Sequence, residues 1–383
     1  MKQSVLVLGS TGSIGRQTIE TLLHARDRFS VVGLSAHSDT ETLLGQARLL
    51  KPRYLACETP IPADALPAGV TPIFGADAST RLAEAVDADV TVLAISGFAA
   101  LKPLLAAMRH GKRIAIANKE SLVCGGDLVD AAQAAYGATL LPIDSEQSAL
   151  FQCLQNGRRQ EVKRLILTAS GGPFFRNSRD ELKDITPEQA VAHPTWRMGK
   201  KISLDSATLC NKGLEIMEAA RLFGFGADEI GVLIHPQSIV HSLVEYRDNT
   251  VMAQLSVPDM RLPIQYALTY PDRVPSLCKP LSLADAHALE FYPVDEARFP
   301  AIRLAYDCLR CGGGCPVVYN GANERAAELF FDGAIPFLAI EACVERALSA
   351  YQNRPMDAPE AVWEADAWAR RFVSDEAGKL RNL

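Results

Sequence analysis

The clearest candidates for chemistry are Asp144 and Glu146, two carboxylates that follow the apolar run Leu141–Ile143. If this run is a buried strand that continues through Glu146, side-chain alternation places both carboxylates on one face and Ser145 on the other. Paired like charges at the rim of a sheet are costly unless a cation or a proton relieves them. Carboxylate oxygens suit Mg2+ or Mn2+. The pattern predicts a divalent metal site, although a solvated acidic strand end has the same sequence.

A glycine-rich loop near the start, Gly9–Gly15, has the spacing G-x-x-G-x-x-G between an expected strand and an expected helix. Glycines permit a tight turn and a close backbone approach, and a helix N-terminus offers free N–H groups to a pyrophosphate. The loop predicts dinucleotide binding at Thr11, Gly12, Ser13 and Ile14; a plain strand–helix turn is the alternative.

The end of the expected second strand bears on the choice of dinucleotide. An acidic residue there would bind a ribose hydroxyl and favour NAD. The segment Ser35–Ser38 instead offers hydroxyls and the imidazole of His37, and Asp39 follows just beyond. This position favours NADPH.

Two further motifs follow apolar strands, at the edge where a doubly wound sheet binds its ligands. Asn118, Lys119 and Glu120 follow one strand, and the lysine could polarise substrate oxygens or lie in solvent. Ser170 opens the segment Ser170–Pro173, whose N–H and hydroxyl groups suit an anion, although an ordinary Gly-Pro turn has the same sequence.

The segment Asp205–Glu215 combines groups that suit a phosphate and a metal. If it opens a helix, Asn211 and Glu215 share a face, and Ser206 lies near the helix start. Ser206, Asn211 and Lys212 could then bind a phosphate while Glu215 joins the metal. An N-capped amphipathic helix with surface charges is the alternative.

The elements that must position these residues alternate before Ser148, which predicts a parallel, doubly wound sheet covered on both faces. The expected strands are Ser4–Leu8, Ser30–Ser35, Tyr54–Cys57, Val90–Ile95, Arg113–Ala117 and Thr139–Ile143. The expected helices include Gln17–His24, Thr40–Leu50, Ala78–Ala85 and Leu101–His110.

A different rhythm follows and predicts a smaller mixed α+β domain. Its expected strands are Arg164–Ala169, Gly231–Ile234, Ile239–Tyr246 and Thr250–Ser256, with a hairpin turn at Arg247–Asn249 and a helix at Ala207–Phe223. A proline-rich stretch, Pro271–Pro300, reads as an extended linker. The remainder is expected to be helical, at Ala301–Leu309, Asn323–Phe331, Pro336–Ala350 and Pro359–Asp375.

Composition narrows the class of protein. The chain has 383 residues and a net charge of -6, so it carries no electrostatic footprint for nucleic acid or an anionic membrane. No apolar run is long enough to span a bilayer, and we expect a cytoplasmic enzyme with reduced thiols. Cys308, Cys311 and Cys315 lack a nearby fourth ligand for zinc and lead into a glycine run, so we expect a structural role for them.

Taken together, these motifs resemble the 1-deoxy-D-xylulose 5-phosphate reductoisomerase family of the non-mevalonate isoprenoid pathway. The resemblance extends over most of the chain, in the family's order and spacing. The stretches that carry it are Gly9–Gly15, Ala117–Leu122, Pro142–Ser148, Ser170–Phe174, His193–Gly199, Lys201–Glu215, His235–Ser242, Val257–Arg261 and Asn320–Glu324.

The resemblance implies a role for each matching side chain. Asp144, Glu146 and Glu215 would bind the metal. Ser170, Ser206, Asn211 and Lys212 would hold the substrate phosphate, and Ser145 and Lys119 would contact its hydroxyl and carbonyl region. The flap that covers the substrate would contain His193, Trp196 and Met198, with Met198 near the nicotinamide and Gly199 also in contact with the cofactor. His241 would lie near the active site, and Asn118, Lys119 and Glu120 would also contact the cofactor.

The family reaction uses NADPH and Mg2+ or Mn2+ to rearrange the sugar phosphate 1-deoxy-D-xylulose 5-phosphate and reduce it to 2-C-methyl-D-erythritol 4-phosphate. The resemblance also implies a homodimer. We expect an NADP-binding domain at residues 1–148, a catalytic domain with the dimer contact at 149–270, a linker at 271–299 and a helical domain at 300–383. One departure, Ala36–Asp39 in place of a Gly-Lys-Asn type of sequence, leaves the contacts to the 2′-phosphate open.

Two other functions share parts of this pattern. A simple NADP-dependent dehydrogenase of the aspartate-semialdehyde or homoserine type would have the same loop but no need of the metal set, and Cys124 would be its candidate nucleophile. A dinucleotide-sensing protein would bind NADPH without turnover. Insensitivity to chelation would favour the dehydrogenase, and the absence of substrate-dependent oxidation would favour the sensor.

Overall fold

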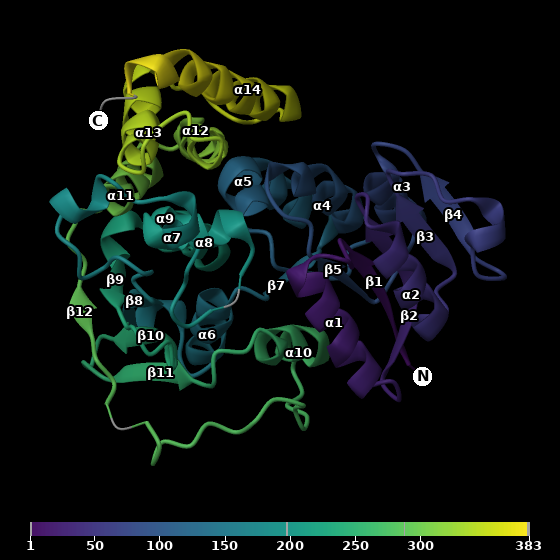
Figure 1. Ribbon diagram of the computed structural model, residues 1–383. Helices are drawn as coiled ribbons and strands as arrows, with labels where there is room; N and C mark the ends of the chain where they lie inside the picture. Colours follow the sequence, from purple (N-terminus) through teal and green to yellow (C-terminus); the bar gives the residue numbers. More distant parts are fainter. Residues whose placement is uncertain (1, 197, 287, 381–383) are drawn as a thin grey trace. The chain divides into compact units, whose positions relative to one another are not determined.

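A computed structural model describes residues 2–196, 198–286 and 288–380 (Figure 1). Arg197, inside one of the resembling stretches, lies outside the described residues. The chain forms two compact units. Unit 1 contains Met1–Ser121, Asp127–Ser148 and Asp259–Lys279, and unit 2 contains Leu122–Gly126, Ala149–Pro258 and Pro280–Leu383. The four predicted domains stay predictions, because these units describe packing and not function.

Unit 1 contains a seven-stranded parallel sheet of order β4-β3-β2-β1-β5-β6-β7. Its strands are β1 (Gln3–Leu8), β2 (Phe29–Ala36), β3 (Tyr54–Cys57), β4 (Thr71–Phe74), β5 (Val90–Leu93), β6 (Arg113–Ile116) and β7 (Thr139–Pro142). The strand order reverses between β1 and β5, and open α/β sheets bind ligands at the carboxyl ends of strands at such a point. The predicted doubly wound sheet is confirmed.

The helices of unit 1 connect these strands. They are α1 (Ser13–His24), α2 (Thr40–Leu50), α3 (Ala78–Ala85), α4 (Leu101–Met108), α5 (Lys119–Tyr136) and α10 (Arg261–Thr269), with short 3-10 turns at Ala63–Ala65 and Phe98–Ala100. The elements that were not predicted are β4, α5 and α10. The short strand β4 contains Pro72, and α5 departs from helical geometry at Gly125, so neither shows a clean sequence pattern.

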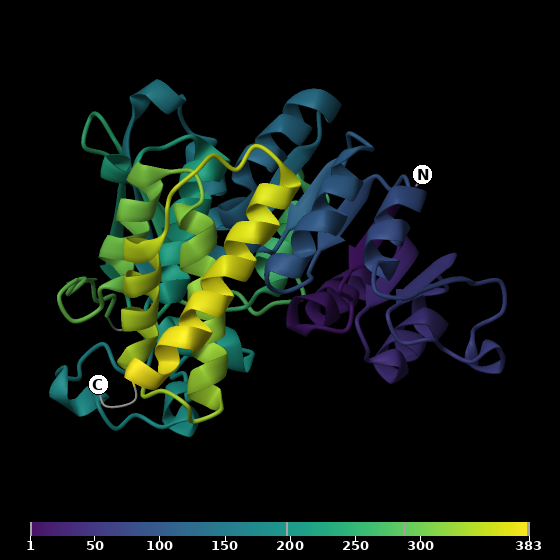
Figure 2. The same ribbon diagram turned by 90° about the horizontal axis from the view of Figure 1, so that it is seen from above.

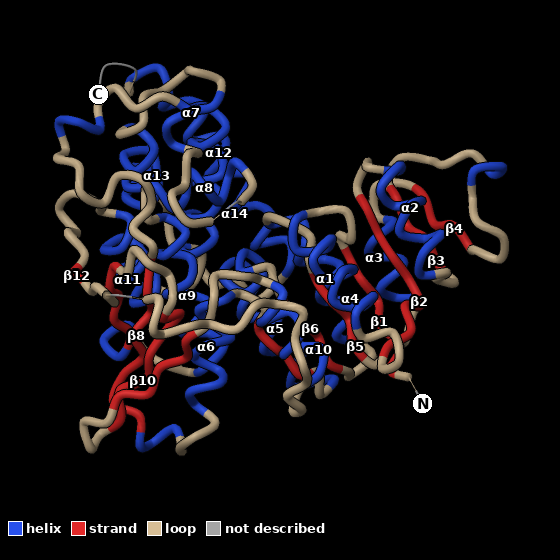
Figure 3. The backbone as a smooth tube through the Cα atoms, turned by 60° about the horizontal axis from the view of Figure 1, so that its bottom comes forward, coloured by secondary structure: helices blue, strands red, loops and turns tan. Residues whose placement is uncertain are grey.

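Unit 2 contains a five-stranded mixed sheet of order β11-β10-β8-β9-β12, drawn in red with the other strands in Figure 3. Its strands are β8 (Val162–Ala169), β9 (Ile230–Ile234), β10 (Val240–Tyr246), β11 (Val251–Leu255) and β12 (Tyr292–Pro293). The pair β8–β9 is parallel, and the others are antiparallel. The predicted hairpin turn between β10 and β11 is confirmed, with Asn249 at a φ of 67°.

The helices of unit 2 are α6 (Ser145–Leu154), α7 (Pro187–Ala190), α8 (Lys200–Ala207), α9 (Cys210–Phe223), α11 (Ala301–Cys311), α12 (Cys315–Phe331), α13 (Ala339–Ala350) and α14 (Pro359–Glu376). The helix α6 begins in unit 1 and continues into unit 2. The 3-10 turns are Arg159–Glu161, Asp180–Leu182, Ala227–Glu229 and Ala377–Lys379. The helix α9 packs on α11, and α12 packs on α13 and α14 (Figure 2).

Several of the expected helices have different bounds, and two of these differences have a clear structural basis. The helix predicted at Ala207–Phe223 is instead two helices, because Leu209 adopts a left-handed backbone with φ of 59° between α8 and α9. The helix predicted at Asn323–Phe331 begins earlier, at Cys315. Its added turns include Gly321, which has a low helix propensity but packs closely on Asp366 and Ala369 of α14. Tertiary packing therefore overrides local preference there.

The structure confirms the α/β fold class: a doubly wound parallel sheet, a mixed sheet with helices, and a group of C-terminal helices. Among the described helices, none is both long and apolar enough to cross a membrane.

Candidate active site

The dinucleotide loop joins β1 to α1 in unit 1. Gly9 has a φ of +83°, and a Cβ atom there would lie 2.7 Å from the backbone of Ala94. A Cβ atom on Gly15 would lie 2.2 Å from the carbonyl oxygen of Gly9, so both positions require glycine. Gly12 is the N-cap residue of α1 and provides no side-chain cap. The first N–H groups of α1 are therefore suited to a pyrophosphate, as the spacing predicts.

The acidic residue that follows β2 already has hydrogen-bond and ion-pair partners. Asp39 is the N-cap of α2, accepts a hydrogen bond from the N–H of Thr42 at 3.1 Å, and forms an ion pair with Arg16 at 3.0 Å. The N–H of Thr42, together with its hydroxyl and Arg16, holds the pKa of Asp39 below its usual value. Because Asp39 caps a helix, it is not a free acid for a ribose hydroxyl. Arg16 is a nearby cation that sequence reasoning missed.

Asn118 connects two loops at the carboxyl edge of the sheet. It caps α5 by accepting the N–H of Ser121 at 2.8 Å, and its amide donates to the carbonyl oxygens of Ile95 and Gly97 at 3.0 Å each. It also donates to Glu120 at 2.9 Å. The loops that follow β5 and β6 are thereby fixed next to the switch point.

Lys119 forms an ion pair with Asp144 in which Nζ and Oδ2 are 2.5 Å apart, and its side chain is only 8% exposed. A buried ammonium needs such a partner. The ion pair links the residue after β6 to the residue after β7, and it excludes the solvated-lysine alternative for Lys119.

Asp144 and Glu146 lie together, but not for the reason that we predicted. The strand β7 ends at Pro142 and α6 begins at Ser145, so side-chain alternation along a strand does not apply and that prediction is wrong. Ser145 donates to Glu146 at 2.5 Å, which also contradicts its predicted place on the opposite face. One oxygen of Asp144 and one of Glu146 lie within 4.8 Å of each other. A strand end followed at once by a helix start thus brings two hard oxygen ligands together.

The helix α9 in unit 2 carries a buried polar cluster formed by Asn211, Lys212 and Glu215. Asn211 and Lys212 each donate to one carboxylate oxygen of Glu215, and Lys212 also donates to the carbonyl oxygen of Thr168 at 2.5 Å. The side chains of Lys212 and Glu215 are 3% and 1% exposed. Asn211 and Glu215 interact four residues apart, as predicted, and burial excludes the surface-charge alternative.

Ser170 lies among groups that could hold an anion. Its Oγ is 2.8 Å from Nε2 of His193 and 3.4 Å from Oγ of Ser206. Ser206 belongs to the last turn of α8, so its predicted place at a helix start is wrong, because Leu209 breaks the helix. Gly172 has a φ of +63°, and a Cβ atom there would lie 2.6 Å from the carbonyl oxygen of Ser206. This close approach brings Ser170 and Ser206 together.

His193 has a defined proton position. Its Nδ1 accepts the N–H groups of Thr195 and Trp196 at 3.1 and 2.9 Å. Burial lowers the pKa of His193, which favours the neutral ring. The single ring proton is therefore on Nε2, which donates to Ser170.

The other residues expected in the flap, Trp196 and Met198, follow His193 closely in sequence. Trp196 meets the ring of His241 edge-on, with ring centroids 6.2 Å apart. His241 is buried, Met198 is half-buried, and Gly199 caps the N-terminus of α8. The structure thus groups Trp196 with His241 in unit 2.

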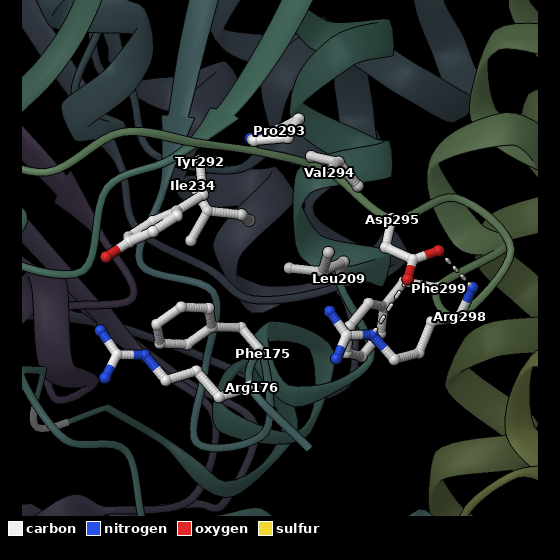
Figure 4. A pocket seen from close by; sticks show the side chains of 10 residues that line it. All are labelled: Phe175, Arg176, Leu209, Ile234, Tyr292, Pro293, Val294, Asp295, Arg298 and Phe299. Atoms are coloured by element: carbon white, nitrogen blue, oxygen red, sulfur yellow. Dashed lines mark hydrogen bonds and ion pairs between the residues drawn. The ribbon is translucent and has the colours of Figure 1, made fainter. Parts of the chain in front are cut away.

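A separate cavity in unit 2, of about 350 Å3, contains none of the predicted site residues in its lining (Figure 4). Phe175, Tyr292 and Phe299 contribute its aromatic wall, and Arg298 pairs with Asp295 at its edge. The left-handed Leu209 also lines it, one residue before α9 begins.

Sequence reasoning also missed a polar network around Asp205 of α8. Asp205 is buried, pairs with Lys201 at 2.5 Å and accepts a hydrogen bond from Asn323 of α12 at 2.9 Å. The resemblance to the family could have indicated this network, since all three residues lie in stretches that carry the resemblance. Their separation along the chain concealed the contact.

Comparison with known proteins decides the family. Models of the 1-deoxy-D-xylulose 5-phosphate reductoisomerase family match residues 5–126, 140–223 and 255–372, the last two as C-terminal domains. A reductoisomerase of Heliobacterium modesticaldum is 46% identical over 391 residues and is covered in full, as is this chain. The chain belongs to the 1-deoxy-D-xylulose 5-phosphate reductoisomerase family.

Solved reductoisomerase structures share the whole fold. The Zymomonas mobilis enzyme in complex with NADPH has a TM-score of 0.94 and 40% identity, with 99% of this chain and 100% of that chain covered. A second reductoisomerase, in complex with NADPH, fosmidomycin and magnesium, has a TM-score of 0.92 and 36% identity, with 98% of each chain covered. Family, fold and relatives agree on an NADPH-dependent reductoisomerase that uses a metal.

Proposed function

We propose that the chain performs the family reaction with the side chains described above, isomerising 1-deoxy-D-xylulose 5-phosphate and reducing it with NADPH to 2-C-methyl-D-erythritol 4-phosphate. The observation that carries the proposal is the carboxylate pair Asp144–Glu146 beside the buried Lys119. Lys119 follows β6 and the carboxylates follow β7, in a sheet whose first loop has the glycines that a dinucleotide site needs. A simple dehydrogenase has no need of the carboxylate pair.

Asp144, Glu146 and Glu215 are the proposed metal ligands. Carboxylate oxygens are the donors that Mg2+ and Mn2+ prefer, and Asp144 and Glu146 already lie close enough to share an ion. When bound, the metal supplies Lewis-acid stabilisation of negative charge on substrate oxygens. Lys119 lies against Asp144, where its ammonium can orient the same oxygens, and Ser145 donates beside it.

Ser170, Ser206, Asn211 and Lys212 are the proposed phosphate ligands. In the described state Asn211 and Lys212 both donate to Glu215. Glu215 would hold the metal through the same oxygens, and Asn211 and Lys212 would then be available to donate to the phosphate. Because the phosphate is remote from the reacting carbons, its binding energy can serve orientation and closure of the site.

His193, Trp196 and Met198 are the proposed flap, and the ring of His241 contacts the ring of Trp196. Met198 and Gly199 are also proposed to contact the cofactor. The neutral His193 donates to Ser170 and accepts two backbone N–H groups, so it fixes the start of the flap next to the phosphate ligands. A closed flap excludes water and protects the aldehyde that precedes reduction.

Thr11, Gly12, Ser13 and Ile14 are proposed to bind the pyrophosphate of NADPH, and Asn118, Lys119 and Glu120 are proposed to contact the cofactor at the carboxyl edge of the sheet. We further propose that Arg16 contributes to recognition of the 2′-phosphate. Its guanidinium donates to the carbonyl oxygen of Thr11 at 2.7 Å and pairs with Asp39. NADPH supplies the hydride.

We also propose that the protein is a homodimer in the cytoplasm. The edge strand β11 exposes Val251 and Met252 together with its unpaired backbone edge, and such an edge invites pairing with a second chain. The nine cysteines, all among the described residues, form no disulfide bond with one another, which suits a reducing compartment. Light scattering should give the mass of two chains, and a monomer with full activity would contradict the dimer.

Identification of the product tests the proposed reaction. Incubation with 1-deoxy-D-xylulose 5-phosphate, NADPH and Mg2+ should give a branched polyol phosphate, recognised by NMR, in equal amount to the NADPH consumed. An unbranched reduced product would show reduction without rearrangement and contradict the proposal.

A further inference from the structure

Two cysteine sulfurs meet at the junction of α11 and α12, inside unit 2. Cys311 is the last residue of α11 and Cys315 is the first of α12, and their Sγ atoms are 3.3 Å apart. Cys311 is exposed, whereas Cys315 is 8% exposed. Cys308 is buried nearby, but among the described residues the three cysteines do not form a group with metal-ligand spacing. The close contact therefore belongs to a pair of thiols.

The backbone between the two sulfurs is held in one shape. Gly312 and Gly313 have φ values of 64° and 56°, and a Cβ atom on Gly313 would lie 2.6 Å from the carbonyl oxygen of Arg354. The amide of Asn353 accepts the N–H of Gly314 at 2.8 Å and donates to the carbonyl oxygen of Gly312 at 3.3 Å. The sulfurs are thus brought together by a fixed turn.

The two thiols differ in reactivity. Burial raises the pKa of Cys315 to about 12, so this sulfur stays protonated. Cys311 is exposed, and its sulfur accepts an N–H from Asn353 at 3.3 Å, which holds it at the surface of the turn. Cys311 is therefore the sulfur that meets an external reagent first, and Cys315 is the partner that reacts second.

We propose that Cys311 and Cys315 are a thiol modification site that forms a reversible disulfide with small disulfides such as glutathione disulfide. The Cys311 thiolate attacks one sulfur of the reagent, breaks its S–S bond and releases the first small thiolate. Cys315 loses its proton to solvent and attacks the Cys311 sulfur, which expels the second small thiolate. Two protein thiols are oxidised and one small disulfide is reduced to two thiols. The sulfurs need to approach only from 3.3 Å to about 2.05 Å.

Mass spectrometry after treatment with glutathione disulfide tests this site, because trypsin releases both cysteines in one peptide, residues 311–325. The full-length protein is treated, its remaining thiols are alkylated, and the peptide should have lost two hydrogen atoms and taken up no alkyl group. Dithiothreitol should reverse the change. Cys315→Ser should instead accumulate a glutathione adduct on Cys311, and Cys311→Ser should take up no adduct in this peptide.

Two further variants separate this site from general thiol reactivity. Asn353→Ala should slow the reaction several-fold, because it removes the hydrogen bond to Cys311 and loosens the turn. Cys278→Ser, at a half-buried cysteine of unit 1, should leave the rate unchanged. Two results would overturn the proposal. One is alkylation of both thiols after treatment, and the other is a glutathione adduct that persists on Cys311 of the protein without substitutions. Activity is not the readout, so the result is independent of the proposed function.

Discussion

Replacing Lys212 by methionine should strongly destabilise the protein. The side chains of Lys212 and Glu215 are 3% and 1% exposed, so Lys212→Met leaves a buried carboxylate that has lost its cation. Removal of one partner from a buried pair costs about 3–5 kcal/mol of unfolding free energy. The hydrogen bond from Asn211 remains and places our expectation at the lower end, about 3 kcal/mol.

The double variant Lys212→Met/Glu215→Gln isolates the charge effect. It removes both charges and should recover most of the loss, leaving a coupling of about 2 kcal/mol or more between the two sites. Lys163→Met is the control, since Lys163 is half-exposed and its buried partner Glu245 keeps a second ion pair with Arg164. We expect less than about 1 kcal/mol for this change.

Urea unfolding of the parent protein, these three variants and the single variant Glu215→Gln, followed by far-UV circular dichroism with and without Mg2+, gives these differences. Mg2+ should partly restore the Lys212→Met variant, because a bound cation replaces the ammonium beside Glu215. If Lys212→Met and Lys163→Met shift the unfolding midpoint equally, the buried pair has no special role and the reasoning is refuted.

Four other predictions use separate parts of the structure. Glu146→Gln should abolish turnover and leave NADPH binding, measured by cofactor fluorescence, within about two-fold, because the proposed role of this residue is to bind the metal and not the nucleotide; equal loss of both would contradict this. Trp196→Ala should raise KM and lower kcat with an unchanged Tm, since this half-buried side chain adds little to the core; a large fall in Tm would contradict a flap role. Arg16→Met should weaken NADPH about ten-fold, the loss of about 1.4 kcal/mol, and leave NADH unaffected; equal weakening of both would place Arg16 away from the 2′-phosphate. Burial raises the pKa of Glu341 to about 8, so the folded state holds a proton that the unfolded state has lost, and stability should fall as pH rises from about 5 to 8. Glu341→Gln should remove that slope in pH-dependent unfolding, and an unchanged slope would contradict the assignment.

Local sequence signals predicted the doubly wound sheet well. Each of the six predicted parallel strands of unit 1 is an apolar run bounded by turns, and the glycines at Gly9 and Gly15 are required by contacts of the loop that contains them. The carboxylate pair was found for the wrong reason: its spacing brings the oxygens together on a strand, but it also does so where a strand ends and a helix begins at Ser145. Pattern alone does not distinguish these two backbones.

The parts that sequence reasoning missed depend on contacts between distant segments. Leu209 adopts a left-handed backbone that leucine seldom favours, so no propensity predicts the break before α9. Asp205 contacts Asn323, which lies more than a hundred residues further along the chain, and Asn353 contacts Cys311 although α12 and α13 separate them in sequence. Such partners become visible only when packing has placed the helices.

The most direct test of the central claim is NADPH absorbance at 340 nm during incubation with 1-deoxy-D-xylulose 5-phosphate, first with Mg2+ or Mn2+ and then with excess EDTA. Absorbance should fall only when substrate and metal are both present, and EDTA should stop the reaction until metal is restored. No fall under any metal, or oxidation that EDTA does not affect, would contradict the metal-dependent reductoisomerase.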